Sequence, residues 1–313
     1  MKTLFIIIPC YNEGACLDSA LCIIWEKLQN LIENGSVSSA SGILLIDDGS
    51  TDDSWAIIKH HHEQNQQIKG IRLASNRGKE FALLAGVLES QNLCDMAICM
   101  DADLQHDINA IEAFIEEYNN GSELVCGLKK SRGKESLFRR ITARLFYWVM
   151  EKLGAPVMNG HSDYCLISKN VINALSEYRE THMMFRGILH QLGFERSYVY
   201  FDVKERIDGC SKMTLKKLLR LSIDAVTSFS VMPLRMILLV GFLISLVSLF
   251  MLIRIVWTYF CNIAPNGWAT ITFSIWFLGG IGMICLAVVG EYIGKIYMET
   301  KRRPRYYIKN RLF

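Results

Sequence analysis

The sequence lacks several patterns that would assign a function at once. Its ten cysteines form no CxxC pair, and neither a full Walker A spacing nor a GxGxxG occurs. These absences argue against a zinc site, a disulfide framework, a P-loop hydrolase and a dinucleotide-dependent oxidoreductase. The net charge of +3 comes without any nucleic-acid-binding motif, so no nucleic-acid partner is expected. The apolar run at 4–8 ends at Pro9 and is too short for a cleavable secretory signal, so none is expected.

Charge is nearly absent from one long stretch of the chain. Between Leu234 and Gly290 the only charged residues are Arg235 and Arg254. Two apolar segments, at about 234–258 and 268–290, are each long enough to cross roughly 30 Å of hydrocarbon as a helix. We therefore predict a two-helix transmembrane hairpin, with a pair of buried soluble helices as the less favoured alternative.

Basic residues after the second apolar segment predict its orientation. They are Lys301, Arg302, Arg303, Arg305, Lys309 and Arg311, and no acidic residue lies among them. Because positive residues stay on the cytoplasmic side, a multi-pass membrane protein with both termini in the cytoplasm is expected.

Two stretches ahead of the hairpin are amphipathic and basic, at 136–153 and 212–232. Helices of this kind either pack on a core or lie in the headgroup layer of a membrane, and both interpretations stay open. We predict a cytoplasmic catalytic domain at 1–205, a basic amphipathic interface segment at 206–232, and two transmembrane helices with a basic cytoplasmic tail at 233–313.

The first part of the chain alternates short apolar strands with longer helical segments. Strands are expected at 3–9, 43–46, 68–73, 96–100 and 124–127, and helices at 15–33, 54–64, 80–91 and 108–119. This alternation predicts an α/β fold with a mostly parallel sheet and helices on both faces. Ligands of such sheets bind beyond the carboxyl ends of the strands.

Polar motifs follow three of these strands: PCYNE at 9–13, DDGS at 47–50 and DADLQ at 101–105. Asp101 and Asp103 could share a hard cation such as Mg²⁺ or Mn²⁺ that leaves positions open for phosphate oxygens. An acidic pair alone also caps helices or faces solvent, and DDGS alone favours a turn with a helix cap. In NRGKE at 76–80, Gly78 and Lys79 could be a simple loop or could offer amides and a cation to an anion.

The motifs occur in one chain together with NGHSDY at 159–164, FRG at 185–187 and RIDGCSK at 206–212. This combination resembles the family-2 glycosyltransferases of the polyprenyl-phosphate type, which include bactoprenol glucosyltransferases and dolichol-phosphate mannose synthases. The resemblance covers essentially the whole chain. GEYIGKIY at 290–297 and the predicted hairpin make the bactoprenol glucosyltransferase branch the closer likeness.

The resemblance implies a GT-A, Rossmann-like fold, a divalent metal (Mg²⁺ or Mn²⁺), and a site on the cytoplasmic face of a bacterial inner membrane. It implies nucleotide-sugar-binding roles for Pro9, Tyr11, Glu13, Ile46, Asp48, Asp101, Ala102, Asp103 and Lys129. It implies metal-binding roles for Asp101, Asp103 and Gln105. Arg206 and Lys212 match a basic pair that binds phosphate, although a solvated basic face would look the same.

Asp103 and Asp163 are the catalytic residues that the resemblance implies. A lipid monophosphate has a second pKa near 6 and does not need a strong base, so Asp163 could instead orient the acceptor, stabilise charge on the sugar, or cap the segment at Tyr164. The chain departs from the family pattern at Lys129 and Cys165, where arginine is usual, and at His161 and Ser162, where a glycine-containing turn is common. These departures put the identity of the sugar in doubt.

The expected reaction is inverting transfer of a hexose, with glucose from UDP-glucose as the expected donor, to undecaprenyl phosphate. The same chemistry with N-acetylglucosamine, galactose, mannose or an aminoarabinose derivative is one alternative. A non-catalytic nucleotide- or lipid-binding homologue is another. Expected partners are a nucleotide sugar, a polyprenyl phosphate lipid and the membrane, and a homo-oligomer stays open.

Overall fold

A computed structural model describes residues 1–129, 161–180, 185–202, 230–260 and 267–313. The chain divides into two compact units, of which the first is Met1–Tyr147, Val157–Met213 and Arg302–Phe313, and the second is Trp148–Pro156 and Thr214–Lys301. The amphipathic stretch at 136–153 lies outside the described residues, as does all but the end of the interface segment predicted at 206–232. Both stay predictions.

The first unit is built on a mixed sheet of eight strands. In sheet order they are β7 (Arg196–Phe201), β5 (Leu124–Lys129), β6 (His161–Ser168), β4 (Met96–Cys99), β1 (Leu4–Cys10), β2 (Gly42–Asp47), β3 (Ile68–Leu73) and β8 (Ile308–Leu312). Only β6 and β8 of these strands run against their neighbours. The expected mostly parallel sheet is therefore confirmed.

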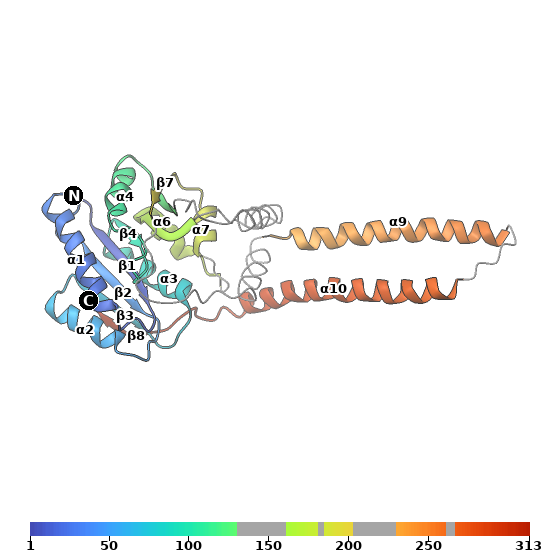
Figure 1. Ribbon diagram of the computed structural model, residues 1–313, viewed down its shortest axis with the longest axis horizontal. Coiled ribbons are helices and arrows are strands. Elements are labelled where there is room, and N and C mark those ends of the chain that lie inside the picture. The colour runs from blue at the N-terminus through green and yellow to red at the C-terminus, as the bar shows by residue number, and fades with distance from the viewer. Residues whose placement is uncertain (130–160, 181–184, 203–229, 261–266) are drawn as a thin grey trace. The chain divides into compact units, whose positions relative to one another are not determined.

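Helices cover both faces of this sheet (Figure 1). They are α1 (Leu17–Glu33), α2 (Ser54–Gln64), α3 (Lys79–Glu89), α4 (Ala110–Asn119), α6 (Lys169–Glu177) and α7 (Phe185–Gln191), and a 3₁₀ turn, η1 (Ser90–Asn92), follows α3. Leu21 of α1 and Phe114 of α4 share one core with Ile6 of β1. Because side chains alternate along a strand, Ile7 points to the opposite face, where α3 packs at Gly86. A Cβ atom at Gly86 would lie 2.4 Å from the side chain of Ile46, so glycine lets α3 lie close to the sheet.

The antiparallel direction of β6 brings a distant segment to the functional edge of the sheet. Cys165 of β6 lies opposite Cys99 of β4. Asp163 precedes Cys165 by two residues and Asp101 follows Cys99 by two, so both reach the same edge. The sequence pattern did not predict β6, and this register is what places Asp163 beside the DADLQ turn.

The last strand, β8, also lies outside the sequence-based expectation. Leu312 pairs with Gly70 of β3, and the Arg311 guanidinium lies 2.9 Å from a Glu89 carboxylate oxygen. From the sequence alone, these residues are expected only to form a basic tail. The chain therefore returns to the sheet after the apolar helices.

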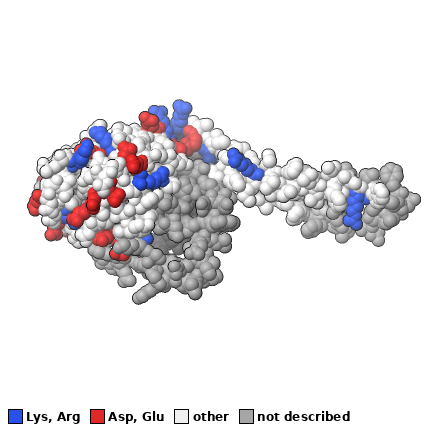
Figure 2. Space-filling view, turned by 90° about the horizontal axis from the view of Figure 1, so that it is seen from above, with Lys and Arg blue, Asp and Glu red and all other residues white. Residues whose placement is uncertain are grey.

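The second unit contains two long helices, α9 (Met232–Phe260) and α10 (Trp268–Thr300). Their apolar side chains are strongly exposed: Leu238 is 76% and Met283 is 69% accessible. Figure 2 shows charged side chains gathered on the globular part and few on the helices. Within the described residues, one helical stretch, Phe277–Thr300, is long and apolar enough to cross a membrane, and the apolar stretch Met232–Ile244 is shorter. Of the two expected membrane spans, the described residues therefore support one.

Candidate active site

A pocket of about 400 Å³ opens at the carboxyl ends of β1, β2 and β4. Its walls are Pro9, Cys10, Tyr11, Glu13, Asp48, Asn76, Gly78, Lys79, Ala82, Asp101, Ala102 and Asp103. The structure thus brings all three strand-end motifs into one pocket and adds the NRGKE segment. Seven of the residues that the resemblance assigns to nucleotide-sugar binding lie there: Pro9, Tyr11, Glu13, Asp48, Asp101, Ala102 and Asp103.

Asp48 holds the NRGKE segment against the end of β2. Its two carboxylate oxygens accept hydrogen bonds from the backbone N–H groups of Arg77 and Gly78, each at 2.8 Å. Gly49 has φ +71°, and a Cβ atom there would lie 2.9 Å from the Asn76 backbone nitrogen. The DDGS turn therefore needs glycine for its backbone and for this close approach. The consequence is a fixed starting point for α3, whose first residue is Lys79.

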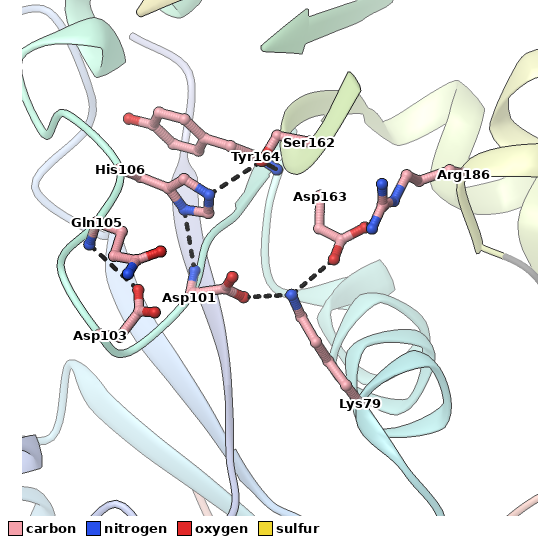
Figure 3. A network of polar contacts seen from close by, with 9 residues as sticks. All are labelled: Lys79, Asp101, Asp103, Gln105, His106, Ser162, Asp163, Tyr164 and Arg186. Carbon is pink, nitrogen blue, oxygen red and sulfur yellow. Dashed lines mark hydrogen bonds and ion pairs between the residues drawn. The ribbon is translucent and has the colours of Figure 1, made fainter. Parts of the chain in front are cut away.

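The other residues implied by the resemblance lie differently. Ile46 is fully buried in β2, packs toward Gly86 and is absent from the pocket wall. Gln105 lies beside Asp103 in Figure 3, and its backbone N–H donates to Asp103 Oδ1 at 3.1 Å. Lys129 is the last residue of β5, where partial burial of its ammonium, Arg186 and Lys79 lower its pKa against the opposing effects of Asp101 and Asp163. Arg206 and Lys212 lie outside the described residues.

Four charged side chains of alternating sign form a continuous chain at this edge (Figure 3). Lys79 Nζ lies 2.6 Å from Asp101 Oδ1 and 2.6 Å from Asp163 Oδ2. Arg186 Nε lies 2.5 Å from Asp163 Oδ1. These residues come from α3, the turn after β4, β6 and α7, so the site is assembled from four separate segments.

The two cations keep Asp163 ionised although the carboxylate is only 7% exposed. Burial alone would raise the pKa of Asp163, but Lys79 and Arg186 outweigh it and lower the pKa to about 2. Burial likewise opposes charge on Lys79, and the carboxylates of Asp101 and Asp163 nevertheless raise its pKa. Lys79 on the pocket wall and its partner Asp163 therefore both stay charged at neutral pH.

Arg186 supplies a cation to Asp163 from α7, whereas position 165, where the family pattern usually has arginine, is a cysteine in this chain. Cys165 itself is buried in the sheet, only 1% exposed. The sequence alone gives Arg186 no role and indicates Lys79 only as a cation that could bind an anion. Neither partner could be assigned without the position of β6.

His106 connects the DADLQ turn to the start of β6. Its Nδ1 accepts the Asp101 backbone N–H at 3.3 Å, which leaves the proton on Nε2 to donate to Ser162 Oγ at 3.0 Å. The ring stacks on Tyr164 with 4.8 Å between centroids. Burial lowers the pKa of His106, so the neutral ring required by this pattern is favoured. The carboxylates of Asp101 and Asp163 are thus held by neighbouring, interlocked segments.

The donor set at the DADLQ turn fits a hard divalent cation incompletely. Asp101 and Asp103 line the pocket, and Gln105 adds an amide oxygen on the same turn. Within the described residues no group of three or more His, Cys, Asp or Glu side chains could hold a metal ion. A bound Mg²⁺ or Mn²⁺ would therefore take further oxygen ligands from water or a phosphate-containing ligand, as such ions commonly do.

Known proteins resemble this chain along most of its length. A model of glycosyl transferase family 2 matches residues 5–176. The uncharacterized glycosyltransferase YkoT of Bacillus subtilis is 39% identical over 97% of this chain and 90% of its own length. A bactoprenol glucosyl transferase of Shigella phage SfX is 32% identical over 98% of both chains. The solved structure of Mycobacterium tuberculosis glucosyl-3-phosphoglycerate synthase with Mn²⁺, uridine diphosphate and glucosyl-3-phosphoglycerate has 17% identity and a TM-score of 0.44 over 72% of this chain and 78% of that one. That last likeness is too weak to support a conclusion about this chain.

Proposed function

The chain belongs to glycosyl transferase family 2, and from that premise we propose that it transfers a hexose, with glucose from UDP-glucose as the expected donor, to undecaprenyl phosphate. The near-full-length likeness to a protein named bactoprenol glucosyl transferase supports the acceptor. The observation that carries the proposal is the pocket lined by Asp101, Asp103 and Lys79, in which Lys79 links Asp101 to Asp163. Such a pocket can hold a donor diphosphate and an acceptor phosphate side by side.

The proposed reaction is a single displacement at the anomeric carbon. An oxygen of the lipid phosphate forms a bond to that carbon while the bond to the diphosphate breaks, and the nucleoside diphosphate leaves with the electron pair. Attack opposite the leaving group inverts the anomeric configuration. Negative charge grows on the diphosphate during this step, and the Lys79 ammonium on the pocket wall is placed to stabilise it.

A divalent cation fits the same scheme. Asp101, Asp103 and Gln105 would hold Mg²⁺ or Mn²⁺, which when bound supplies positive charge to the leaving diphosphate.

The charges around Asp163 favour an orienting role over general-base catalysis. A carboxylate whose pKa is held at about 2 is a weak base. A lipid phosphate is already largely dianionic at neutral pH and can attack without losing a proton. We therefore propose that Asp163 positions Lys79 and Arg186 around the acceptor or stabilises positive charge that develops on the sugar ring.

A lipid acceptor requires the pocket to work next to a membrane. The exposed apolar surfaces of α9 and α10 are suited to lipid, and we propose that both helices cross a bacterial inner membrane as a hairpin. The basic residues from Lys301 to Arg311 keep both termini and the catalytic unit in the cytoplasm. In this arrangement Arg206 and Lys212 would bind phosphate near the headgroup layer.

The test is transfer to undecaprenyl phosphate from a panel of nucleotide sugars, with mass detection of the lipid product. UDP-glucose is expected to give the largest signal. A stronger signal with another nucleotide sugar would change the assigned donor but not the proposed reaction. No lipid-linked product from any donor would favour a non-catalytic binding protein.

Asp103→Asn should lower transfer at least about a hundredfold, because the turn loses a carboxylate ligand for the cation at the leaving diphosphate. The matched control is Asp53→Asn, the same change at an exposed position before α2 and outside the pocket. It should leave transfer unchanged. Full activity of Asp103→Asn would contradict the assignment of the DADLQ turn.

A further inference from the structure

Lys79 lies where it would compete with a bound metal ion for the carboxylate of Asp101. Its ammonium lies 2.6 Å from Asp101, one of the two carboxylates that fit a divalent cation. On its other side it lies 2.6 Å from the buried carboxylate of Asp163. In Figure 3 the lysine side chain reaches between the two aspartates from the start of α3.

Two carboxylates on one small site repel each other unless a cation lies between them. Lys79 supplies that charge from within the chain, and Arg186 adds a second cation only on the far side of Asp163. Asp101 is the more accessible of the two carboxylates, 28% exposed against 7% for Asp163. Of the two contacts of Lys79, the one to Asp101 is therefore the easier for a solvated ion to displace.

We propose that Lys79 is a built-in substitute for the metal ion: it neutralises Asp101 while the pocket is empty and gives up this contact when a divalent cation binds. The contact to Asp163 persists, so the ammonium stays at the pocket wall and turns one free side toward a phosphate. This proposal rests on the proposed function only in assuming that Asp101 binds the metal.

The position of Lys79 is fixed by features other than its own charge. Asp48 holds the two residues before it through their backbone N–H groups, and Gly78 has φ +95°, which favours glycine. The side chain starts from a rigid helix end and needs to move only at its tip. A local exchange of one ion pair for a metal contact is therefore sufficient, without a change of fold.

The exchange has a consequence for the end of a catalytic cycle. When the nucleoside diphosphate and the cation leave, Asp101 would otherwise be left without a counter-charge in contact with it. Return of the ammonium to Asp101 keeps the turn after β4 and the start of β6 in register. Lys79 would then compete with the metal, lowering its affinity for the empty pocket and easing product release.

The test measures how tightly Mn²⁺ alone binds to the full chain in detergent. The electron paramagnetic resonance signal of free Mn²⁺ reports how much of the ion is bound. Lys79→Met removes the charge at similar side-chain length and should tighten Mn²⁺ binding about tenfold, because the competing cation is gone. Lys79→Arg keeps the charge and should stay closer to the original protein. Unchanged or weaker binding in Lys79→Met would overturn the proposal, since a merely structural lysine would disorder the site when removed.

The matched control is Lys59→Met, which makes the same change of net charge on the surface of α2. Lys59 is 60% exposed and lies 3.7 Å from Glu63. It should bind Mn²⁺ as the original protein does, and equal tightening in both variants would reduce the effect to net charge and overturn the proposal.

A second variant changes Mn²⁺ affinity in the opposite direction. Asp163→Asn leaves Lys79 with Asp101 as its remaining charged partner in this pair of contacts, so Mn²⁺ should bind more weakly than in the original protein. Tighter Mn²⁺ binding in Asp163→Asn would contradict the proposal that Lys79 takes the place of the metal ion. If Lys79→Met does not fold without metal, added Mn²⁺ is expected to restore its folding, as measured by thermal unfolding. Failure of Mn²⁺ to do so would also count against the proposal. None of these measurements uses the sugar donor or the lipid, so the proposed function can fail while this inference stands.

Discussion

The two units of this chain place their apolar side chains in opposite surroundings. In the sheet, Ile6 and Ile7 are completely buried, whereas Leu238 and Met283 in the long helices are mostly exposed. Removing apolar surface from water stabilises the first unit by about 25 cal/mol per Å². Exposed apolar surface of this kind instead marks contact with a partner or a membrane. The comparison teaches that apolar side chains are packed inward in the first unit and exposed on the long helices, so substitutions should affect the two parts differently.

The largest difference is expected when the same charge is added to each unit. Met283→Lys puts a charge in the middle of α10 and should make the free energy of membrane insertion less favourable by about 3 kcal/mol. Ile23→Lys adds a charge on α1 at a side chain that is 46% exposed, where surface changes cost within about 0.5 kcal/mol. The measurement is the share of full-length chain that resists alkaline extraction from membranes.

Equal extraction of the two variants would break the comparison. It would mean that the exposed face around Met283 meets water or protein, and the proposed hairpin would have to be abandoned for α10.

Acid should weaken the first unit through Asp163. Its pKa in the folded chain is about 2, below the ordinary value of 3.8, so the folded state favours the ionised form. The associated stability is present above about pH 4 and is lost as pH falls toward 2, amounting in all to about 2 kcal/mol. Asp163→Asn removes this titration, so its unfolding free energy should change less between pH 4 and pH 2 than that of the original protein. Parallel pH profiles would show that Asp163 is not ion-paired in solution.

The local elements of the first unit were predictable because their signals lie within the elements. The apolar runs at 68–73 and the helix at 54–64 coincide with β3 and α2, and the other strands and helices up to Asn119 differ by a few residues at their ends. The strand-end motifs reached one pocket because parallel strands share a carboxyl edge.

The rest depended on pairing that the sequence does not display. β6 reads HSDYCLIS, whose polar first half hides the strand, and β8 reads IKNRL, whose central residues are exposed at a sheet edge. Without the register of β6, the contacts of Asp163 with Lys79 and Arg186 could not be foreseen, since these residues lie 84 and 23 positions away. The direction of the Ile46 side chain is likewise not visible in the motif: in the structure, the alternation of β2 turns it toward α3, and the nucleotide-binding role that the resemblance implies stays a prediction.

The smallest effect is expected where the chain returns to the sheet. Arg311 of β8 makes two contacts with the Glu89 carboxylate, at 2.9 and 3.0 Å, but its side chain is 50% exposed. Arg311→Ala should therefore lower the stability of the first unit by no more than about 1 kcal/mol. The loss should shrink at high salt, because exposed ion pairs are screened. Thermal unfolding at low and high salt, with Lys309→Ala on the same strand as control, measures it. A large loss of stability that does not depend on salt would mean that Arg311 holds β8 by packing rather than by charge. The strand β8 would then contribute to stability as a buried strand does, and not as an exposed edge.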